Sequence, residues 1–234
     1  MKVVFDHAEE VAQSVKTLWF RPERPVRYIA GQFTEIHLPH EPADERGMRR
    51  WFTLSSSPTD PLISITTKFA TSRASSFKRE LARLKPGTTL HLADPMGDFV
   101  LPKNPQIPLL FVAAGLGITP VHSMIKWLLD SGERRQIHLI YAAAQLDELA
   151  FTPLFERYPL TFTPIIKRPP EGYRGQSGSI AVERLLDLAP DDGRSLIYLS
   201  GPEAMTETFF RDLTARGISP DRLVTDYFPG YSSF

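Results

Sequence analysis

The chain contains no cysteine in its 234 residues, and this absence excludes several classes of site. Without cysteine there is no disulfide framework, no thiolate zinc site and no iron–sulfur cluster held by cysteine sulfur. The chain also lacks an excess of charge, because 27 Lys and Arg balance 27 Asp and Glu. Dedicated nucleic-acid-binding proteins normally carry a basic excess, so we expect no nucleic acid among the partners.

Long apolar runs are missing as well. The longest mostly apolar stretch, residues 107–118, is shorter than the ~20 residues that a membrane-spanning helix needs. The first fifteen residues include acidic side chains where a signal peptide would have an uninterrupted apolar segment. We therefore expect a cytoplasmic protein that has no membrane partner.

The residues that are present suit a globular fold. Hydrophobic residues make up 42% of the chain and aromatic residues 11%, which excludes a disordered chain. At roughly 150 residues per domain, the length allows one or two domains. The six histidines lack the clustered spacing of a metal site, so we expect no bound metal.

The first hundred residues are predicted to form strands. Five short segments rich in Thr, Ile, Val and aromatic residues lie at 15–22, 32–39, 49–56, 62–69 and 88–95. Strands with this spacing predict a small antiparallel barrel. One helix is predicted among them, because Phe77, Leu81 and Leu84 recur at helical spacing behind Ser75, a candidate N-cap.

Strands alternate with helices after a proline-rich stretch at residues 101–108. The predicted strands are 108–115, 136–144, 160–168, 195–201 and 221–228, and the predicted helices are 120–132, about 147–158, 179–189 and 203–217. This alternation favours parallel strands with helices on both faces of the sheet. We therefore predict an antiparallel barrel domain over residues 1–104 and a parallel-sheet α/β domain over residues 105–234.

A glycine-containing turn, AAGLGITP at residues 113–120, joins a predicted buried strand to a helix. Gly115 and Gly117 permit a tight turn, Thr119 is a candidate helix cap, and Pro120 suits the first helical position. The free N–H groups at such a helix start can bind a pyrophosphate, although the same kind of turn is also ordinary architecture.

A second segment, Arg50-Trp51-Phe52-Thr53, lies on a predicted barrel strand. Alternation places Arg50 and Phe52 on one face and the other two residues on the opposite face. An arginine can bind a phosphate, an aromatic side chain can flank a flat ring, and a hydroxyl can hydrogen-bond a ring nitrogen. By themselves these residues are also typical of a half-buried strand face.

Six motifs, taken in order along the chain, resemble those of the ferredoxin–NADP reductase superfamily. They are AGQF (30–33), RWFTLSSSP (50–58), SRASSFKREL (72–81), DPMGDFVLP (94–102), AAGLGITP (113–120) and LSGPEAM (199–205). That superfamily couples an antiparallel flavin-binding barrel to a parallel-sheet α/β domain that binds a nicotinamide dinucleotide. The resemblance therefore implies FAD, and either NADP or NAD, as the cofactors.

The resemblance implies roles for barrel residues that match the flavin motifs. Arg50 would pair with the flavin phosphate, Phe52 would pack beside the isoalloxazine ring or ribityl chain, and Thr53 would hydrogen-bond near the flavin N5. Ser75 and Ser76 would hold the pyrophosphate of FAD with their hydroxyl and backbone N–H groups. Since FMN has no pyrophosphate, this segment favours FAD over FMN.

It also implies roles for residues of the second domain. The pyrophosphate of the nicotinamide cofactor would be held by Gly115, Gly117, Ile118 and Thr119. The path of the nicotinamide toward the flavin would be lined by Gly201, Pro202 and Met205. Ser200 stands where the superfamily usually has cysteine, so Ser200 and Thr53 are the catalytic candidates, although serine lacks the polarisability of sulfur.

Other positions depart from the superfamily pattern. Phe52 stands where tyrosine is frequent, and Ser72 where glycine is usual. Many relatives end at an aromatic residue near Phe228, whereas this chain continues. The candidates for an aromatic side chain that covers the flavin are Tyr227, Phe228, Tyr231 and Phe234, and ordinary packing is the alternative.

The choice between NADPH and NADH depends on a 2′-phosphate, which basic side chains favour. Lys167 and Arg168 follow a predicted strand, and Arg174 comes soon after them. These residues either hold the 2′-phosphate, which is the interpretation we favour and which selects NADPH, or belong to a solvated loop. NADH stays open, because QLDEL after the strand at 136–144 has no basic residue where many NADP-using relatives place an arginine.

The resemblance implies a flavoprotein reductase that passes hydride from NAD(P)H to bound FAD and then electrons to a separate ferredoxin, flavodoxin or oxygenase component. Any cysteine-bound iron–sulfur centre would lie on that partner. The basic residues within 73–85 are either a solvated helix face or a docking face for an acidic carrier. Two alternatives stay open: a flavin reductase with dissociable flavin, and a nucleotide-sensing module without turnover.

Overall fold

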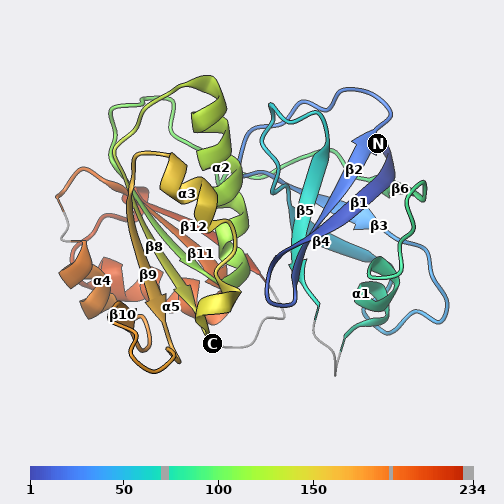
Figure 1. Ribbon diagram of the computed structural model, residues 1–234. Coiled ribbons are helices and arrows are strands. Elements are labelled where there is room, and N and C mark those ends of the chain that lie inside the picture. The colour runs from blue at the N-terminus through green and yellow to red at the C-terminus, as the bar shows by residue number, and fades with distance from the viewer. Residues whose placement is uncertain (70–73, 190–191, 229–234) are drawn as a thin grey trace.

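The computed structural model describes residues 1–69, 74–189 and 192–228, with the side chain of Phe228 excepted. It contains two six-stranded sheets that lie side by side, one built from the first half of the chain and one from the second (Figure 1). Residue 104 lies between the last strand of the first sheet and the first strand of the second. The domain boundary at that residue stays a prediction.

The first sheet is antiparallel and closes on itself. Its strands are β1 (Lys2–Ala12), β2 (Val15–Pro22), β3 (Phe33–His37), β4 (Arg49–Thr53), β5 (Ile63–Lys68) and β6 (Thr89–Leu92), in the order β4-β3-β6-β1-β2-β5. Leu54, directly after β4, forms a bridge to Ile65 of β5. Because this bridge joins the two edge strands, the predicted antiparallel barrel is confirmed.

Strand β1 is a central strand that was not predicted from the sequence. It pairs with both β2 and β6. Val3 and Phe5 point into the barrel core, but Glu9 and Glu10 in its second half are exposed. The alternation of apolar and polar residues that marks a strand is therefore confined to its first half.

Helix α1 (Ser76–Leu81) packs on the barrel. Ser75 is its N-cap as predicted, since the Ser75 hydroxyl accepts a hydrogen bond from the backbone N–H of Lys78 at 3.2 Å. Phe77 and Leu81 are buried in the barrel core. The helix ends three residues before Leu84, so the predicted extent was too long.

The second sheet is parallel throughout. Its strands are β7 (Leu109–Ala114), β8 (Ile137–Ala143), β9 (Thr161–Ile166), β10 (Gln176–Ser177), β11 (Leu196–Pro202) and β12 (Leu223–Phe228), in the order β10-β9-β8-β7-β11-β12. All six residues of β7 are buried, as expected of a central parallel strand. This sheet confirms the predicted α/β architecture, although the short strand β10 was not predicted.

Helices cover both faces of the parallel sheet (Figure 1). α2 (Ile118–Ser131) and α3 (Thr152–Arg157) pack with one face, and α4 (Val182–Leu188) and α5 (Glu203–Ala215) pack with the other. The helix predicted over about 147–158 is shorter than expected. It consists of α3 and a separate 3₁₀ turn, η2 (Leu146–Glu148), and Pro153 stands near the start of α3.

Helix α2 also ties the barrel to the parallel sheet. The His122 ring donates through Nδ1 to the carbonyl of Ser55 at 2.7 Å, and the Ser123 hydroxyl donates to the carbonyl of Ser56 at 2.5 Å. Lys126 pairs with Asp60 at 3.3 Å. All three barrel residues lie just beyond β4, so α2 fixes the end of this strand against the second sheet.

Candidate functional site

The parallel sheet changes direction between β7 and β11. The chain leaves β7 for β8 on one side and later returns to β11 on the other. In open α/β sheets, ligands bind in the crevice at the carboxyl ends of the strands at such a point. Here the crevice is bounded by Ala114, the last residue of β7, by Gly115 directly after it, and by Ser200, Gly201 and Pro202 at the end of β11.

The turn after β7 rests directly on the end of β11. It is a 3₁₀ turn, η1 (Gly115–Gly117), and Gly115 has φ +52°. A Cβ added at Gly117 would lie 2.1 Å from the carbonyl oxygen of Ser200 and 2.7 Å from the backbone nitrogen of Gly201. The two glycine loops, which are far apart in sequence, are therefore in backbone contact, and Gly117 cannot carry a side chain.

The helix after this turn begins earlier than predicted. α2 starts at Ile118 with Gly117 at the N-cap, so the expected cap at Thr119 and the first helical position at Pro120 were wrong. The Thr119 hydroxyl instead donates to the carbonyl of Leu116 at 2.9 Å. The 3₁₀ turn already gives Gly117 helical backbone angles, and the α-helix follows without a side-chain cap.

A small cavity of about 40 Å³ lies at this turn and reaches the barrel. Gly115, Gly117, Ile118, Gly201 and Pro202 line it together with Lys68 and Glu148. Lys68 of β5 pairs with Glu148 of η2 at 3.1 Å. Three of the residues assigned to the nicotinamide cofactor's pyrophosphate, Gly115, Gly117 and Ile118, thus lie beside an ion pair that joins the two halves, whereas Thr119 does not line this cavity.

A second cavity, of about 300 Å³, lies beyond the ends of β8, β9 and β11. Lys167, Pro202 and Met205 line it, as do Ala142, Ala143 and Ser179. Arg168 is exposed beside Lys167 and does not line the cavity. Lys167, predicted from its position after a strand, and Met205, predicted from a motif, thus come together at one cavity, and both were assigned to the nicotinamide cofactor.

A third cavity, of about 400 Å³, lies between the two sheets. The barrel contributes Phe33, Trp51, Phe52, Thr53 and Met96, and β12 contributes Thr225, Asp226 and Tyr227. Thr53 is buried, whereas Trp51 and Tyr227 are about half exposed at 52% each. Phe52 and Thr53, predicted from a barrel motif, therefore face the last strand of the parallel sheet.

Arg50 and Phe52 share a face of β4, as alternation predicted. The Phe52 ring stacks on Phe77 with centroids 6.0 Å apart, and the Arg50 guanidinium lies 5.3 Å above the same Phe77 ring. Arg50 donates through Nη1 to the carbonyls of Arg46 and Arg49. Its buried Nη2 makes no hydrogen bond, and the carboxylate of Asp44 lies 3.7 Å away.

Ser75 and Ser76 have protein partners of their own. The Ser75 hydroxyl caps α1. The backbone N–H of Ser76 donates to the Asp44 carboxylate at 2.8 Å, and the Ser76 hydroxyl bonds to the backbone N–H of Asp44 at 2.9 Å and to His40 Nε2 at 2.8 Å. Their assignment to the FAD pyrophosphate stays a prediction, and any such contact has to compete with these bonds.

Ser200 and Asp226 are neighbours across the parallel sheet. Ser200 pairs in register with Asp226 of β12. The Ser200 side chain is fully buried and its hydroxyl makes no hydrogen bond. Burial raises the pKa of the half-buried Asp226 carboxyl to about 7.

Asp226 was not among the residues singled out from the sequence, where residues 221–228 served only as a predicted strand. A signal was present, because Asp226 is an acidic residue directly before two aromatic residues. What could not be inferred is its neighbour, since Ser200 and Asp226 come together only through strand order.

Comparison with known proteins finds a matching domain in the second half of the chain and relatives along most of its length. Residues 111–210 match the oxidoreductase NAD-binding domain. The chain is 24% identical to the reductase component of propane 2-monooxygenase from Rhodococcus jostii, over 94% of this chain and 61% of that protein. It is 28% identical to the toluate 1,2-dioxygenase electron transfer component from Pseudomonas putida, over 82% of this chain and 56% of that protein.

Two solved structures share the fold. A cytochrome P450 reductase from Amycolatopsis superposes with a TM-score of 0.82 at 19% identity, covering 97% of this chain and 70% of that one. Ferredoxin–NADP⁺ reductase from Plasmodium falciparum superposes with a TM-score of 0.77 at 16% identity, covering 97% and 95%. The chain therefore has the two-sheet fold of these reductases. It spans about three-fifths of the length of the two curated relatives named above.

The resemblance in the sequence implies a flavin and a nicotinamide dinucleotide, and two atoms of this chain fit such groups. In the part of the chain that the structure describes, the buried side-chain polar atoms without a hydrogen bond are Arg50 Nη2 and Ser200 Oγ. A buried donor left unpaired costs about 1–3 kcal/mol. Arg50 Nη2 suits a phosphate oxygen, and Ser200 lies in β11 where the turn at Gly117 rests on that strand.

Some residues of the superfamily pattern cannot be placed. Phe228 ends β12 by its backbone, but its side chain lies outside the described structure, as do Ser72, Tyr231 and Phe234. Over the described ranges, no helix has both the length and the apolar character needed to cross a membrane. The same residues contain no group of three or more His, Asp or Glu placed to hold a metal ion.

Proposed function

We propose that this chain is a flavoprotein reductase that transfers hydride from NAD(P)H to bound FAD and then passes electrons to a separate carrier protein. The observation that carries this proposal is the convergence of both sheets on the 400 Å³ cavity. Phe52 and Thr53 approach it from the barrel, and Asp226 and Tyr227 approach it from β12. A flavin ring between them would be within reach of a nicotinamide bound at the end of β11.

The two cofactors supply the hydride chemistry, and the protein orients them and excludes water. Arg50 would hold the flavin phosphate, while Phe52 and Thr53 would contact the flavin ring. Ser200 is buried where the turn after β7 meets β11, and it offers an unpaired hydroxyl. Gly117 lets the turn after β7 rest on β11, which would bring the pyrophosphate end of the nicotinamide cofactor close to this junction.

NADPH is the proposed electron donor. Lys167 lines the 300 Å³ cavity at the end of β9, and Arg168 lies exposed beside it. A 2′-phosphate in this cavity would gain a favourable interaction with Lys167, and Arg168 could reach it from the surface beside the cavity. NADH would lack this interaction, although the rest of its binding surface would be the same.

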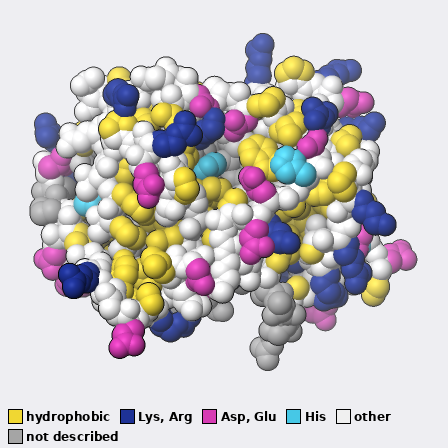
Figure 2. Space-filling model, in the orientation of Figure 1, with side chains coloured by type: hydrophobic (Ala, Val, Ile, Leu, Met, Phe, Trp, Pro, Cys, Tyr) yellow, Lys and Arg dark blue, Asp and Glu magenta, His cyan; other side chains and the backbone are white. Residues whose placement is uncertain are grey.

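The proposed acceptor is a ferredoxin, a flavodoxin or an oxygenase component on a separate chain. The two curated relatives are named as a reductase component and an electron transfer component of oxygenases. Trp51 and Met96 are exposed at the cavity between the sheets. Lys and Arg side chains gather on the part of the barrel that carries α1 (Figure 2), and this charge favours an acidic carrier.

The test is the visible spectrum of the purified, desalted protein, followed by identification of the flavin released on heating. We expect bound FAD and rapid oxidation of NADPH with ferricyanide as acceptor. Failure of flavin-supplemented protein to oxidise either NADPH or NADH would contradict a reductase and leave a nucleotide-sensing module.

A flavin reductase with dissociable flavin is the second candidate. It is favoured by the contacts of Asp44 with Arg50 and Ser76, because a flavin phosphate has to compete with bonds that the protein already makes. A colourless protein that oxidises NAD(P)H only after flavin is added would support this candidate over the first.

A further inference from the structure

The loop between β3 and β4 places the carboxylate of Asp44 near Arg50. Asp44, on this loop, accepts a hydrogen bond from the backbone N–H of Ser76 at 2.8 Å and one from the backbone N–H of Arg46 at 3.1 Å. The Ser76 hydroxyl in turn bonds to the backbone N–H of Asp44. Asp44 is therefore held in place from two sides, by its own loop and by the first residue of α1.

The Asp44 carboxylate is close to Arg50 but does not accept a hydrogen bond from its Nη2. Asp44 Oδ1 lies 3.7 Å from Arg50 Nη2, whereas a charge-assisted hydrogen bond is about 2.7–2.9 Å long. Arg50 Nη2 consequently keeps an N–H with no acceptor. The arginine is partly neutralised by an internal anion while it can still donate to a second one.

The Asp44 carboxylate is ionised at neutral pH. The hydrogen bond from the backbone of Ser76 is the main reason that the pKa of Asp44 lies below its usual value, and the neighbouring Arg46 adds to the effect. A phosphate that reached Arg50 Nη2 would lie within a few ångströms of this fixed negative charge. Like charges at such a distance repel each other, and the repulsion is stronger in a partly buried site than in water.

We propose that Asp44 sets the flavin specificity of this chain by competing with the flavin phosphate for Arg50. The inference rests on the proposed function, because it takes the flavin phosphate to bind at Arg50. Riboflavin has no phosphate, so its binding is insensitive to Asp44. FMN and FAD bind less tightly than they would if Asp44 were absent. The phosphate group therefore adds little affinity over riboflavin.

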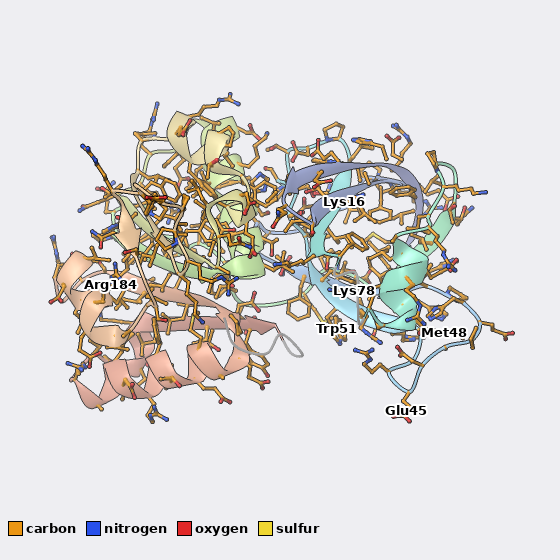
Figure 3. All side chains as sticks on the ribbon, turned by 60° about the horizontal axis from the view of Figure 1, so that its bottom comes forward. Lys16, Glu45, Met48, Trp51, Lys78 and Arg184 are labelled. Carbon is orange, nitrogen blue, oxygen red and sulfur yellow. The ribbon has the colours of Figure 1, made fainter. Side chains whose placement is uncertain are left out.

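The chain offers a matched control on the same loop. Glu45 is exposed, and in Figure 3 it lies at the outer end of the loop and points away from α1. Glu45→Gln removes one negative charge from the loop, as does Asp44→Asn. In Asp44→Asn the side-chain oxygen can still accept from the Ser76 N–H, so the loop is expected to keep its conformation.

The experiment measures dissociation constants for riboflavin, FMN and FAD by quenching of flavin fluorescence, at one fixed salt concentration. Asp44→Asn should tighten the binding of FMN and FAD by about five- to tenfold, because one repulsive charge is removed from the phosphate site. The affinity for riboflavin should change by less than about twofold, and Glu45→Gln should behave like the unaltered chain.

Two outcomes overturn the role of Asp44. One is an unchanged ratio of FMN to riboflavin affinity in Asp44→Asn, and the other is an equal shift in Glu45→Gln, which would indicate a general charge effect. If the unaltered chain binds none of the three flavins, the proposed function fails along with the inference. If the chain binds flavins but Asp44→Asn gains no preference for FMN over riboflavin, the inference is refuted and the proposed function is not.

Hydrogen exchange on the unaltered chain gives a second readout that needs no variant. Bound FMN should weaken the bond from Ser76 to Asp44, so amides of residues 44–48 and 76 should exchange faster with FMN than with riboflavin at equal saturation. Equal exchange with the two ligands contradicts competition at Arg50.

Discussion

Neighbouring arginines on β4 have different surroundings. Arg49 is exposed and pairs with Glu35 at 2.9 Å on the outside of the barrel. Arg50 is packed over Phe77 and keeps a buried N–H group without an acceptor. The alternation of a strand places the two guanidinium groups on opposite faces, so a change at one should not reproduce a change at the other.

Arg50→Ala should weaken the binding of FMN and FAD at least about tenfold, because a charge-assisted hydrogen bond contributes about 1.5–3 kcal/mol. Arg49→Ala removes the same charge from the opposite face and should leave the affinity almost unchanged. Fluorescence titration measures both, and thermal unfolding without flavin checks stability. A large fall in the Tm of Arg50→Ala even in excess flavin would indicate a structural role instead.

Asp226 makes stability depend on pH through its raised pKa. Its pKa is about 7 in the folded chain against 3.8 as the ordinary value, so folding favours the protonated carboxyl. The stabilisation from this group is complete below about pH 4 and is lost as the pH rises through 7. Asp226→Asn cannot ionise and should not show this loss.

Between pH 4 and pH 8, the free energy of unfolding of Asp226→Asn should therefore rise relative to the unaltered chain by about 1–3 kcal/mol. Urea unfolding at several pH values measures the difference. Asp221→Asn, at an exposed residue in the turn before β12, is the control. A constant difference across this range would show that Asp226 is ionised throughout.

At the scale of the element, the carboxyl end of each parallel strand supplies one part of the site. β7 ends in the glycine turn, β9 ends beside Lys167, and β11 ends in Ser200, Gly201 and Pro202. Parallel strands bring these ends to one edge of the sheet. This is why the strand–helix alternation in the sequence is enough to group most of the nicotinamide-site residues.

The end of β9 gives a test of the proposed NADPH preference. The double variant Lys167→Ala with Arg168→Ala should raise the KM for NADPH about tenfold or more and leave the KM for NADH nearly unchanged, since only NADPH carries the 2′-phosphate. Steady-state kinetics with both donors and one artificial acceptor measures this. Arg194→Ala is the control, because Arg194 lies just before the amino end of β11 and the proposed site lies at the carboxyl ends of the strands. Equal effects on both donors would refute the 2′-phosphate assignment.

Local sequence patterns were least informative where tertiary contacts decide the structure. Strand β1 is recognisable in its first half only, and its remaining polar residues are held by pairing with β2. The start of α2 was misassigned because Thr119 and Pro120 form a familiar cap pattern. Gly117 stands at the N-cap instead, in contact with β11, and nothing in the local sequence indicates that contact.

At the scale of the whole molecule, α2 joins the barrel to the parallel sheet through a histidine. His122 donates to the Ser55 carbonyl and stacks on Phe151 with centroids 3.8 Å apart. Burial is the main reason that its pKa falls to about 4, while Asp60 and Lys126 nearby act in opposite directions. The His122 ring is therefore neutral when the barrel and the parallel sheet are packed together.

Because the pKa of His122 is lower in the folded chain than its ordinary value of 6.5, its stabilisation is present above about pH 6.5 and is lost as the pH falls through 4. Between pH 7 and pH 4, the free energy of unfolding of His122→Gln should fall by about 2–3 kcal/mol less than that of the unaltered chain. Urea unfolding measures this, with His91→Gln on the exposed side of β6 as the control. Identical acid sensitivity in the two variants would contradict the role of His122.

The sequence by itself determined the two kinds of sheet, most of the strands, the cap at Ser75 and the ordered motifs of the superfamily, because each depends on residues close together in the chain. Only the tertiary structure decided that Ser200 pairs with Asp226, that Asp44 lies against Arg50, and that β12 faces Thr53 across one cavity. These contacts depend on strand order and on a loop returning to the barrel. Contacts between residues far apart in the chain leave no local pattern, because the sequence between the two partners can vary without changing the contact.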